Sequence, residues 1–198
     1  MVLAYHIVLG LYGFWLPNDP RGSYSDFVGA WDLFRSGGKA TRDRDTREGL
    51  STEEARSPER SALKRSLKFP AVRLSGQQAL AVAQGFARGA SDMELRFAAC
   101  AIMPDHIHMV LTRQEMAIER VLIRLKSEAT RSLVQQGIHP LAKFADQEGR
   151  PPKCFSRGAW TSYLNAESDV RSAIHYVEQN PIREGLKPQR WSFVKPTV

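Results

Sequence analysis

The sequence predicts an α+β domain in which helices cover an antiparallel sheet. Four runs have the apolar character of strands, two stretches between them have the apolar periodicity of helices, and a further helical stretch follows. In chain order the segments are strand, helix, strand, strand, helix, strand and helix. The first six have the β-α-β-β-α-β order of a ferredoxin-like domain, an antiparallel sheet with helices on one face. The last helix is an addition to that order.

The composition indicates one globular domain and favours a polyanionic partner. The 198 residues are enough for one sizeable core, and 42% hydrophobic with 25% charged residues is ordinary for a globular protein. The formal net charge of +7 favours nucleic acid, although a basic protein without such a partner has the same excess. Cys100 and Cys154 lack metal-type spacing and are expected to be reduced thiols of a cytoplasmic protein. No apolar run is long enough to span a bilayer, and the N-terminus lacks the features of a signal peptide.

The region from about Ser23 to Pro70 is expected to be an insertion in this single domain of residues 1–198. Ser36–Glu59 is dominated by small, polar and charged residues, which is typical of an exposed, mobile segment. Arg60–Lys68 could form a basic helical turn that touches phosphates, or a solvated charged face. The role of this insertion is left open.

The first predicted strand, Val2–Tyr12, is followed after the insertion by the first helix. The strand has apolar residues at both parities, as in a central strand that is covered on both faces. Ser75 is a good N-cap for the helix, with Gln78 placed for a capping box, and Gly89 is expected to end it.

The second helix is expected over roughly Glu115–Gln136, where an apolar stripe recurs at helical spacing and Gly137 provides a stop. Basic residues decorate its flanks. They are candidates for contacts with a DNA backbone or are ordinary surface residues: Arg120, Arg124, Lys126 and Arg131.

Two histidines share one face of the third strand. The buried strand Glu94–Met103 is joined through Pro104-Asp105 to a run that contains His106 and His108, so these two strands are expected to pair as a hairpin. Successive side chains of a strand point to opposite faces, so the two imidazoles point the same way. Two such imidazoles can bind one metal ion. The alternative is a polar strand edge with two solvated histidines.

His6, in the first strand, is expected to be a packed, hydrogen-bonded histidine, although it could line the same site as His106.

The last helix, Asn165 to Asn180, follows a short strand at Gly158–Leu164 and is expected to be halted by Pro181. Tyr176 and Asn180 are four residues apart, so they lie on one side of the helix, at the shoulder of its apolar stripe. Tyr176 can therefore pack its ring while it presents its hydroxyl to a cleft. The alternative for Tyr176 is a boundary aromatic residue. The alternative for Asn180 is a residue that ends a helix before proline.

The order of four segments resembles that of the single-tyrosine HUH transposases. The segments are PDHIHMVL, a basic amphipathic helix, a strand with a tryptophan, and YVEQNPIREGL. That family includes insertion-sequence transposases and REP-associated tyrosine transposases, and HUH stands for His-hydrophobic-His. The resemblance runs from about Ser75 to Trp191 and extends to the first strand, Ala4–Tyr12. The main departure is the charged insertion, which puts target recognition in doubt.

The resemblance implies a mechanism. Tyr176 would be the nucleophile, His106 and His108 would be metal ligands, and Asn180 would be the third ligand. The family cleaves and rejoins single-stranded DNA, often at hairpin-forming ends, through a 5′-phosphotyrosine, and it normally uses Mg²⁺ or Mn²⁺. Imidazole by itself prefers Mn²⁺ or Zn²⁺ over Mg²⁺. A homodimer, in which the tyrosine works in its own or in the other subunit, is left open.

Two other functions remain open. One is a domesticated relative that binds structured DNA or RNA without cutting it. The other is a metal-dependent nuclease in which water attacks instead of Tyr176.

Overall fold

A computed structural model gives the architecture and describes residues 1–16, 64–65 and 67–195. The predicted insertion at 23–70 lies almost entirely outside the described residues, so its role stays a prediction. Within the described part of the chain, no helix is long and apolar enough to cross a membrane.

A four-stranded antiparallel sheet forms the middle layer of the fold. Its strands are β1 (Ala4–Gly10), β2 (Phe97–Ile102), β3 (His106–Thr112) and β4 (Trp160–Leu164), in the order β2-β3-β1-β4 across the sheet. All neighbouring pairs are antiparallel, and β2 and β3 form the predicted hairpin. β1 is a central strand, which explains its apolar residues at both parities.

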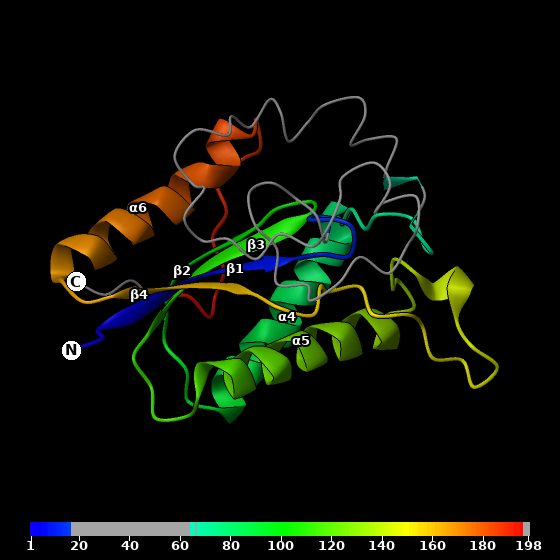
Figure 1. The fold of residues 1–198 in the computed structure, drawn as a ribbon, viewed down its shortest axis with the longest axis horizontal. Coiled ribbons are helices and arrows are strands. Elements are labelled where there is room, and N and C mark those ends of the chain that lie inside the picture. Colours follow the sequence, from blue (N-terminus) through cyan, green and yellow to red (C-terminus); the bar gives the residue numbers. More distant parts are fainter. Residues whose placement is uncertain (17–63, 66, 196–198) are drawn as a thin grey trace.

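Helices cover both faces of this sheet. α4 (Gly76–Asp92) and α5 (Ile118–Gln135) pack together on one face, and α6 (Glu167–Arg183) covers the other (Figure 1). A single 3₁₀ turn, η1 (Ala142–Phe144), lies in the connection to β4. The predicted α+β class, with an additional C-terminal helix, is confirmed.

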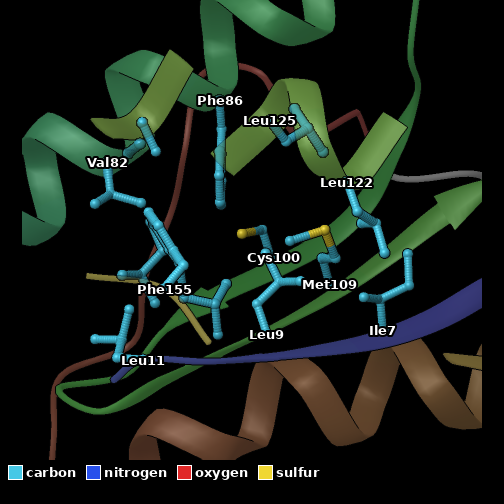
Figure 2. Packing of buried hydrophobic residues seen from close by; sticks show 14 of the residues in the cluster. Ile7, Leu9, Leu11, Val82, Phe86, Cys100, Met109, Leu122, Leu125 and Phe155 are labelled. Atoms are coloured by element: carbon cyan, nitrogen blue, oxygen red, sulfur yellow. The ribbon is translucent and has the colours of Figure 1, made fainter. Parts of the chain in front are cut away.

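The larger core fills the space between the sheet and the α4–α5 layer. Ile7, Leu9 and Met109 point from the strands toward Phe86 of α4 and Leu125 of α5 (Figure 2), and all five are almost fully buried. Because side chains alternate along a strand, their sequence neighbours point to the α6 face.

The two helices of this layer cross closely at Gly85. A Cβ atom on Gly85 would lie 2.5 Å from the Cα of Ala129 on α5. The crossing therefore requires glycine on α4.

A smaller core lies under α6. Small side chains of the sheet, such as Ala4 and Ala101, allow the helix to approach, and Ala173 and Val177 of α6 are buried against them. This packing fixes the position of α6 over β2 and β3.

The sequence predicted the start of α4 correctly but not its end. The capping box between Ser75 and Gln78 is present in both directions, as predicted. The prediction that Gly89 ends the helix is wrong, because the helix continues to Asp92. Gly89 is buried inside it, where a Cβ atom would lie 3.0 Å from the side chain of Leu125. Gly89 therefore allows α5 to pack closely against α4 and does not end the helix.

Pro181 does not halt α6 as predicted. It lies inside the last turn, and the helix ends at Arg183. The proline gives up only its own backbone donor, while its carbonyl accepts from Leu186 N at 2.8 Å. Gly185, with φ of +74°, then turns the chain out of the helix.

Candidate metal and nucleophile site

The site lies on the α6 face of the sheet. Ile107 and Met109 of β3 belong to the α4–α5 core, so His106 and His108 point the opposite way, as the alternation predicted. His6 of β1 has the same parity as Ala4, which packs under α6, and therefore faces the same side. Three imidazoles from two paired strands are thus brought together.

The two histidines of β3 converge through one nitrogen each. The Nε2 atoms of His106 and His108 are 3.0 Å apart. Two nitrogens that bind one cation at ~2.0–2.1 Å, at right angles to each other, lie ~3 Å apart. The pair therefore fits two ligands of a single divalent ion. Among the described residues, no group of three His, Cys, Asp or Glu side chains completes such a site.

Asp105 orients the first of these rings. Its Oδ1 lies 2.8 Å from His106 Nδ1, and its Oδ2 lies 3.2 Å from Arg73 Nη1. Burial by itself raises the pKa of Asp105, but the hydrogen bond and charge of His106, with the charges of Arg73 and Lys64, bring it below its usual value. The resulting carboxylate can only accept, so His106 carries its proton on Nδ1 and directs Nε2 to His108.

His108 and His6 are neutral partners. His108 is 6% exposed, and burial, followed by the charges of His106 and His6, lowers its pKa to about 3. Burial also lowers the pKa of His6. His6 Nε2 lies 3.3 Å from His108 Nδ1. His6 is thus hydrogen-bonded, as expected, and it also lines the site, which the sequence left as the less favoured alternative.

Phe14 packs against His106, a contact that the sequence did not indicate. The two rings are stacked with centroids 4.6 Å apart. Gly10 is the residue paired with His106 across the strands, and a Cβ atom on it would lie 3.1 Å from the Phe14 ring. A side chain at position 10 would therefore disturb this stack.

Tyr176 on α6 lies beside the histidines of its own chain. Its ring meets His108 and His6 edge-to-face, with centroid distances of 5.5 and 5.7 Å. The residue is 41% exposed, in agreement with its predicted place at the shoulder of the apolar stripe. The guanidinium carbon of Arg183, two turns later, lies 5.7 Å from the centre of the Tyr176 ring.

Asn180 lies one turn after Tyr176 and is buried, with 8% exposure. Within the described chain, its side chain forms no hydrogen bond with either histidine of β3. Its role as a third ligand therefore stays a prediction.

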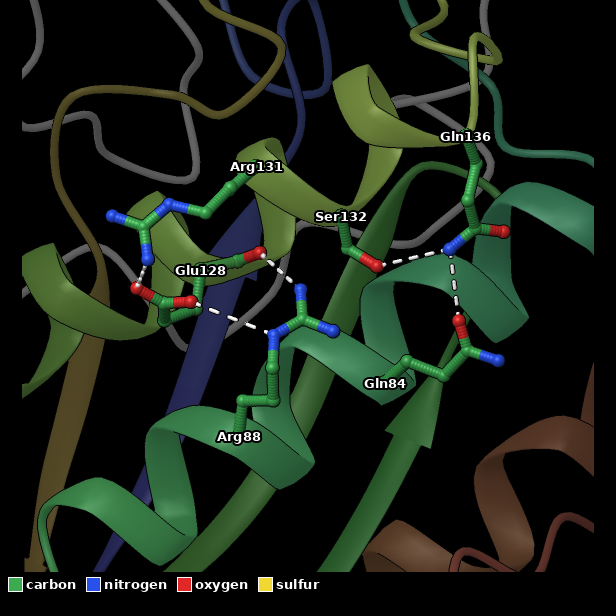
Figure 3. A network of polar contacts seen from close by, with 6 residues as sticks. All are labelled: Gln84, Arg88, Glu128, Arg131, Ser132 and Gln136. Atoms are coloured by element: carbon green, nitrogen blue, oxygen red, sulfur yellow. Dashed lines mark hydrogen bonds and ion pairs between the residues drawn. The ribbon is translucent and has the colours of Figure 1, made fainter.

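The basic residues of α5 are on the other side of the sheet from the histidines. Arg120 and Arg124 are exposed on this helix, so a DNA contact by them would lie a full layer away from Tyr176. Arg131 pairs with Glu128, which also meets Arg88 of α4 (Figure 3). The structure does not bring these arginines into the site, and their contact with DNA stays a prediction.

Lys126 has a structural role. Its Nζ donates to the backbone carbonyls of Ser156, Arg157 and Gly158, at 3.0, 3.4 and 2.8 Å. Burial lowers its pKa to about 8. An ammonium group has three donors, so these contacts use all of them in this structure and fix the segment that precedes β4, and a DNA contact by Lys126 stays a prediction.

The solved structures that match this chain include the following two. A REP-associated tyrosine transposase bound to a REP hairpin has a TM-score of 0.49 and 11% identity, over 99% of this chain and 93% of that one. A protein provisionally described as a transposase from Deinococcus radiodurans R1 has a TM-score of 0.45 and 12% identity, over 94% and 92%. No family model and no curated protein matches the chain.

Proposed function

We propose that the protein is a transposase that cleaves and rejoins single-stranded DNA through a 5′-phosphotyrosine on Tyr176. The observation that carries the proposal is the position of the Tyr176 ring, 5.5 Å from the ring of His108 in the same chain. The Nε2 pair of His106 and His108 supports it, because the spacing suits a divalent ion. Mg²⁺ or Mn²⁺ bound there would polarise the phosphoryl oxygens and offset the charge of the transition state.

Tyr176 is the group of the chain that forms and later releases the covalent bond to DNA. Tyr176 Oη attacks phosphorus, a new P–O bond forms, and the bond from phosphorus to the 3′-oxygen breaks. The phenol gives up its proton to solvent as it attacks, the leaving 3′-oxygen takes a proton from solvent and departs as a hydroxyl, and the 5′-phosphate stays on the tyrosine. A 3′-hydroxyl can later attack this ester, rejoin the strand and restore the phenol. No nucleotide cofactor is needed for either step.

The proposed substrate is single-stranded DNA with a hairpin at the element end, in line with the motif resemblance and the net charge of +7. Tyr176 meets the histidines of its own chain, so a second subunit is not needed to bring these groups together. Cys100 and Cys154 are free and buried, which suits a reducing compartment such as the cytoplasm.

A denaturing gel tests the proposal. The protein is incubated with labelled, hairpin-containing single-stranded DNA and Mg²⁺ or Mn²⁺. We expect a covalent protein–DNA band that is lost in Tyr176→Phe. Tyr163→Phe is the matched control, because Tyr163 is also exposed but packs against Tyr5 on the other face of the sheet.

The same gel separates the alternatives. Cleavage that survives Tyr176→Phe without a covalent band would indicate attack by water. DNA binding without any cleavage would indicate a non-cleaving binder of structured nucleic acid.

A further inference from the structure

We propose that His6 is a positioning residue that determines which ring nitrogen of His108 is free to bind a cation. The inference rests on the proposed function, since it requires a cation held by His106 and His108. It concerns a residue of β1, outside the motifs that suggested the site.

The geometry is a chain of four side chains. Asp105 Oδ1 meets His106 Nδ1 at 2.8 Å, and His106 Nε2 meets His108 Nε2 at 3.0 Å. On the far side of the His108 ring, Nδ1 meets His6 Nε2 at 3.3 Å. The rings of His6 and His108 are nearly parallel, at 18°. Each imidazole therefore has its proton position constrained by its neighbour.

The proton positions without a cation follow from the carboxylate. The carboxylate of Asp105 requires a proton on His106 Nδ1, so in the singly protonated ring Nε2 is an acceptor. His108 must then donate from Nε2, which leaves its Nδ1 as an acceptor. His6 consequently donates from its own Nε2.

A bound cation would replace the hydrogen bond between His106 and His108 and reverse the one between His108 and His6. It needs the lone pairs of both Nε2 atoms, so His108 must carry its proton on Nδ1 instead. That proton needs an acceptor, and His6 Nε2 becomes one when His6 moves its own proton to Nδ1. Both protons exchange through solvent, and the number of bound protons does not change.

His6 is not a third ligand in this arrangement. It faces the nitrogen of His108 that points away from His106. One cation cannot bind nitrogens on opposite sides of the same ring. The contribution of His6 is therefore to stabilise the cation-binding tautomer of His108, as outer partners of metal-bound histidines do.

Nitrogen NMR of the full-length wild-type protein, with ¹⁵N-labelled histidines, reads these tautomers directly. We expect His108 and His6 to carry Nε2 protons without metal and Nδ1 protons when Zn²⁺, a diamagnetic probe, is added. The inference is overturned if Zn²⁺ binds and His108 keeps its Nε2 proton, or if His6 keeps its tautomer.

Affinity for Mn²⁺, followed by the EPR signal of the free ion, supplies a second readout. His6→Leu removes the acceptor and should weaken binding about 10- to 100-fold. His6→Gln keeps an acceptor near the position of Nε2 and should remain within about threefold of wild type. Equal losses in both variants, or no loss in His6→Leu, would refute the role of His6.

Thermal unfolding of both variants checks that they fold, and the wild-type NMR result stands without them. A wild-type protein that binds neither ion would overturn the proposed cation site together with this inference. Normal ion binding with unchanged tautomers would overturn the role of His6 alone.

Discussion

Replacing Asp105 with asparagine should weaken the binding of a divalent cation at His106 and His108. The carboxylate is only 28% exposed, and the hydrogen-bonded ring of His106 is 15% exposed. An amide at this position still offers an oxygen acceptor, but without the charge that keeps the proton on His106 Nδ1. The substitution therefore changes the strength of the bond and leaves the volume of the side chain almost unchanged.

The size of the effect follows from the type of hydrogen bond. A bond to a charged group contributes ~1.5–3 kcal/mol, and a bond between neutral groups ~0.5–1.5 kcal/mol. The midpoints of these ranges differ by ~1.2 kcal/mol, which corresponds to about an eightfold weaker affinity in Asp105→Asn.

Arg73→Gln is the matched comparison, because Arg73 touches Asp105 but is 69% exposed. An ion pair at such an exposed position contributes only ~0–1 kcal/mol. Removing its positive charge should leave cation affinity unchanged or slightly tighter. If only long-range charge mattered, Asp105→Asn and Arg73→Gln would change cation affinity by similar amounts in opposite directions.

Titration of both variants and wild type with Mn²⁺, read by EPR, measures these affinities, and circular dichroism confirms the fold. An Asp105→Asn variant that binds Mn²⁺ within twofold of wild type would refute the role given to Asp105. An Arg73→Gln variant that loses as much affinity as Asp105→Asn would do the same.

Three further predictions concern the scaffold of the site. Lys126→Met removes the ammonium donor of three carbonyl groups, of which that of Gly158 keeps another donor, Ser156 Oγ at 3.5 Å. It should lower the free energy of unfolding by about 2–4 kcal/mol, against ~0.5 kcal/mol for Arg120→Gln, as measured by urea unfolding. Equal stability of the two variants would contradict the structural role of Lys126. Gly85→Ala places a methyl group against the backbone of α5 and should cost about 1–3 kcal/mol, whereas Gly76→Ala, with open space at the start of the same helix, should be neutral or stabilising. Burial raises the pKa of Cys154 to about 11, so the folded state keeps its proton longer than the unfolded state, and stability should fall by ~2–3 kcal/mol as pH rises from the ordinary thiol range to 11. Cys154→Ala should have a shallower slope, because Cys100, whose pKa burial also raises, keeps its own contribution, and a slope equal to that of wild type would refute the assignment.

Local signals in the sequence were sufficient for several parts of the fold. The capping box of Ser75 and Gln78 is formed by neighbours in the chain, and it is present as predicted. The shared direction of His106 and His108 follows from strand alternation alone, and the partial exposure of Tyr176 follows from helical periodicity.

Long-range packing decided what the sequence could not. Gly89 was expected to end a helix, but its reason is the contact with Leu125, which comes from another helix. Pro181 is compatible with the last turn of α6, so its presence does not mark the helix end.

The remaining site residues depend on strand register and on the face that each helix covers. Periodicity places Arg120 and Arg124 on the flank of a helix but does not indicate which face of the sheet that helix covers. The neighbourhood of His6 depends on the pairing of β1 with β3, between residues about one hundred positions apart. The parity that His6 shares with Ala4 becomes informative only when that pairing is known.

The most direct test of the central claim is to locate the covalent bond to DNA. The protein is incubated with hairpin-containing single-stranded DNA and Mn²⁺, digested with trypsin and nuclease, and examined by mass spectrometry. We expect a nucleotide 5′-phosphate on the peptide that contains Tyr176, and on no other tyrosine. Cleaved DNA with an unmodified Tyr176, or with the phosphate on a different side chain, would contradict the account.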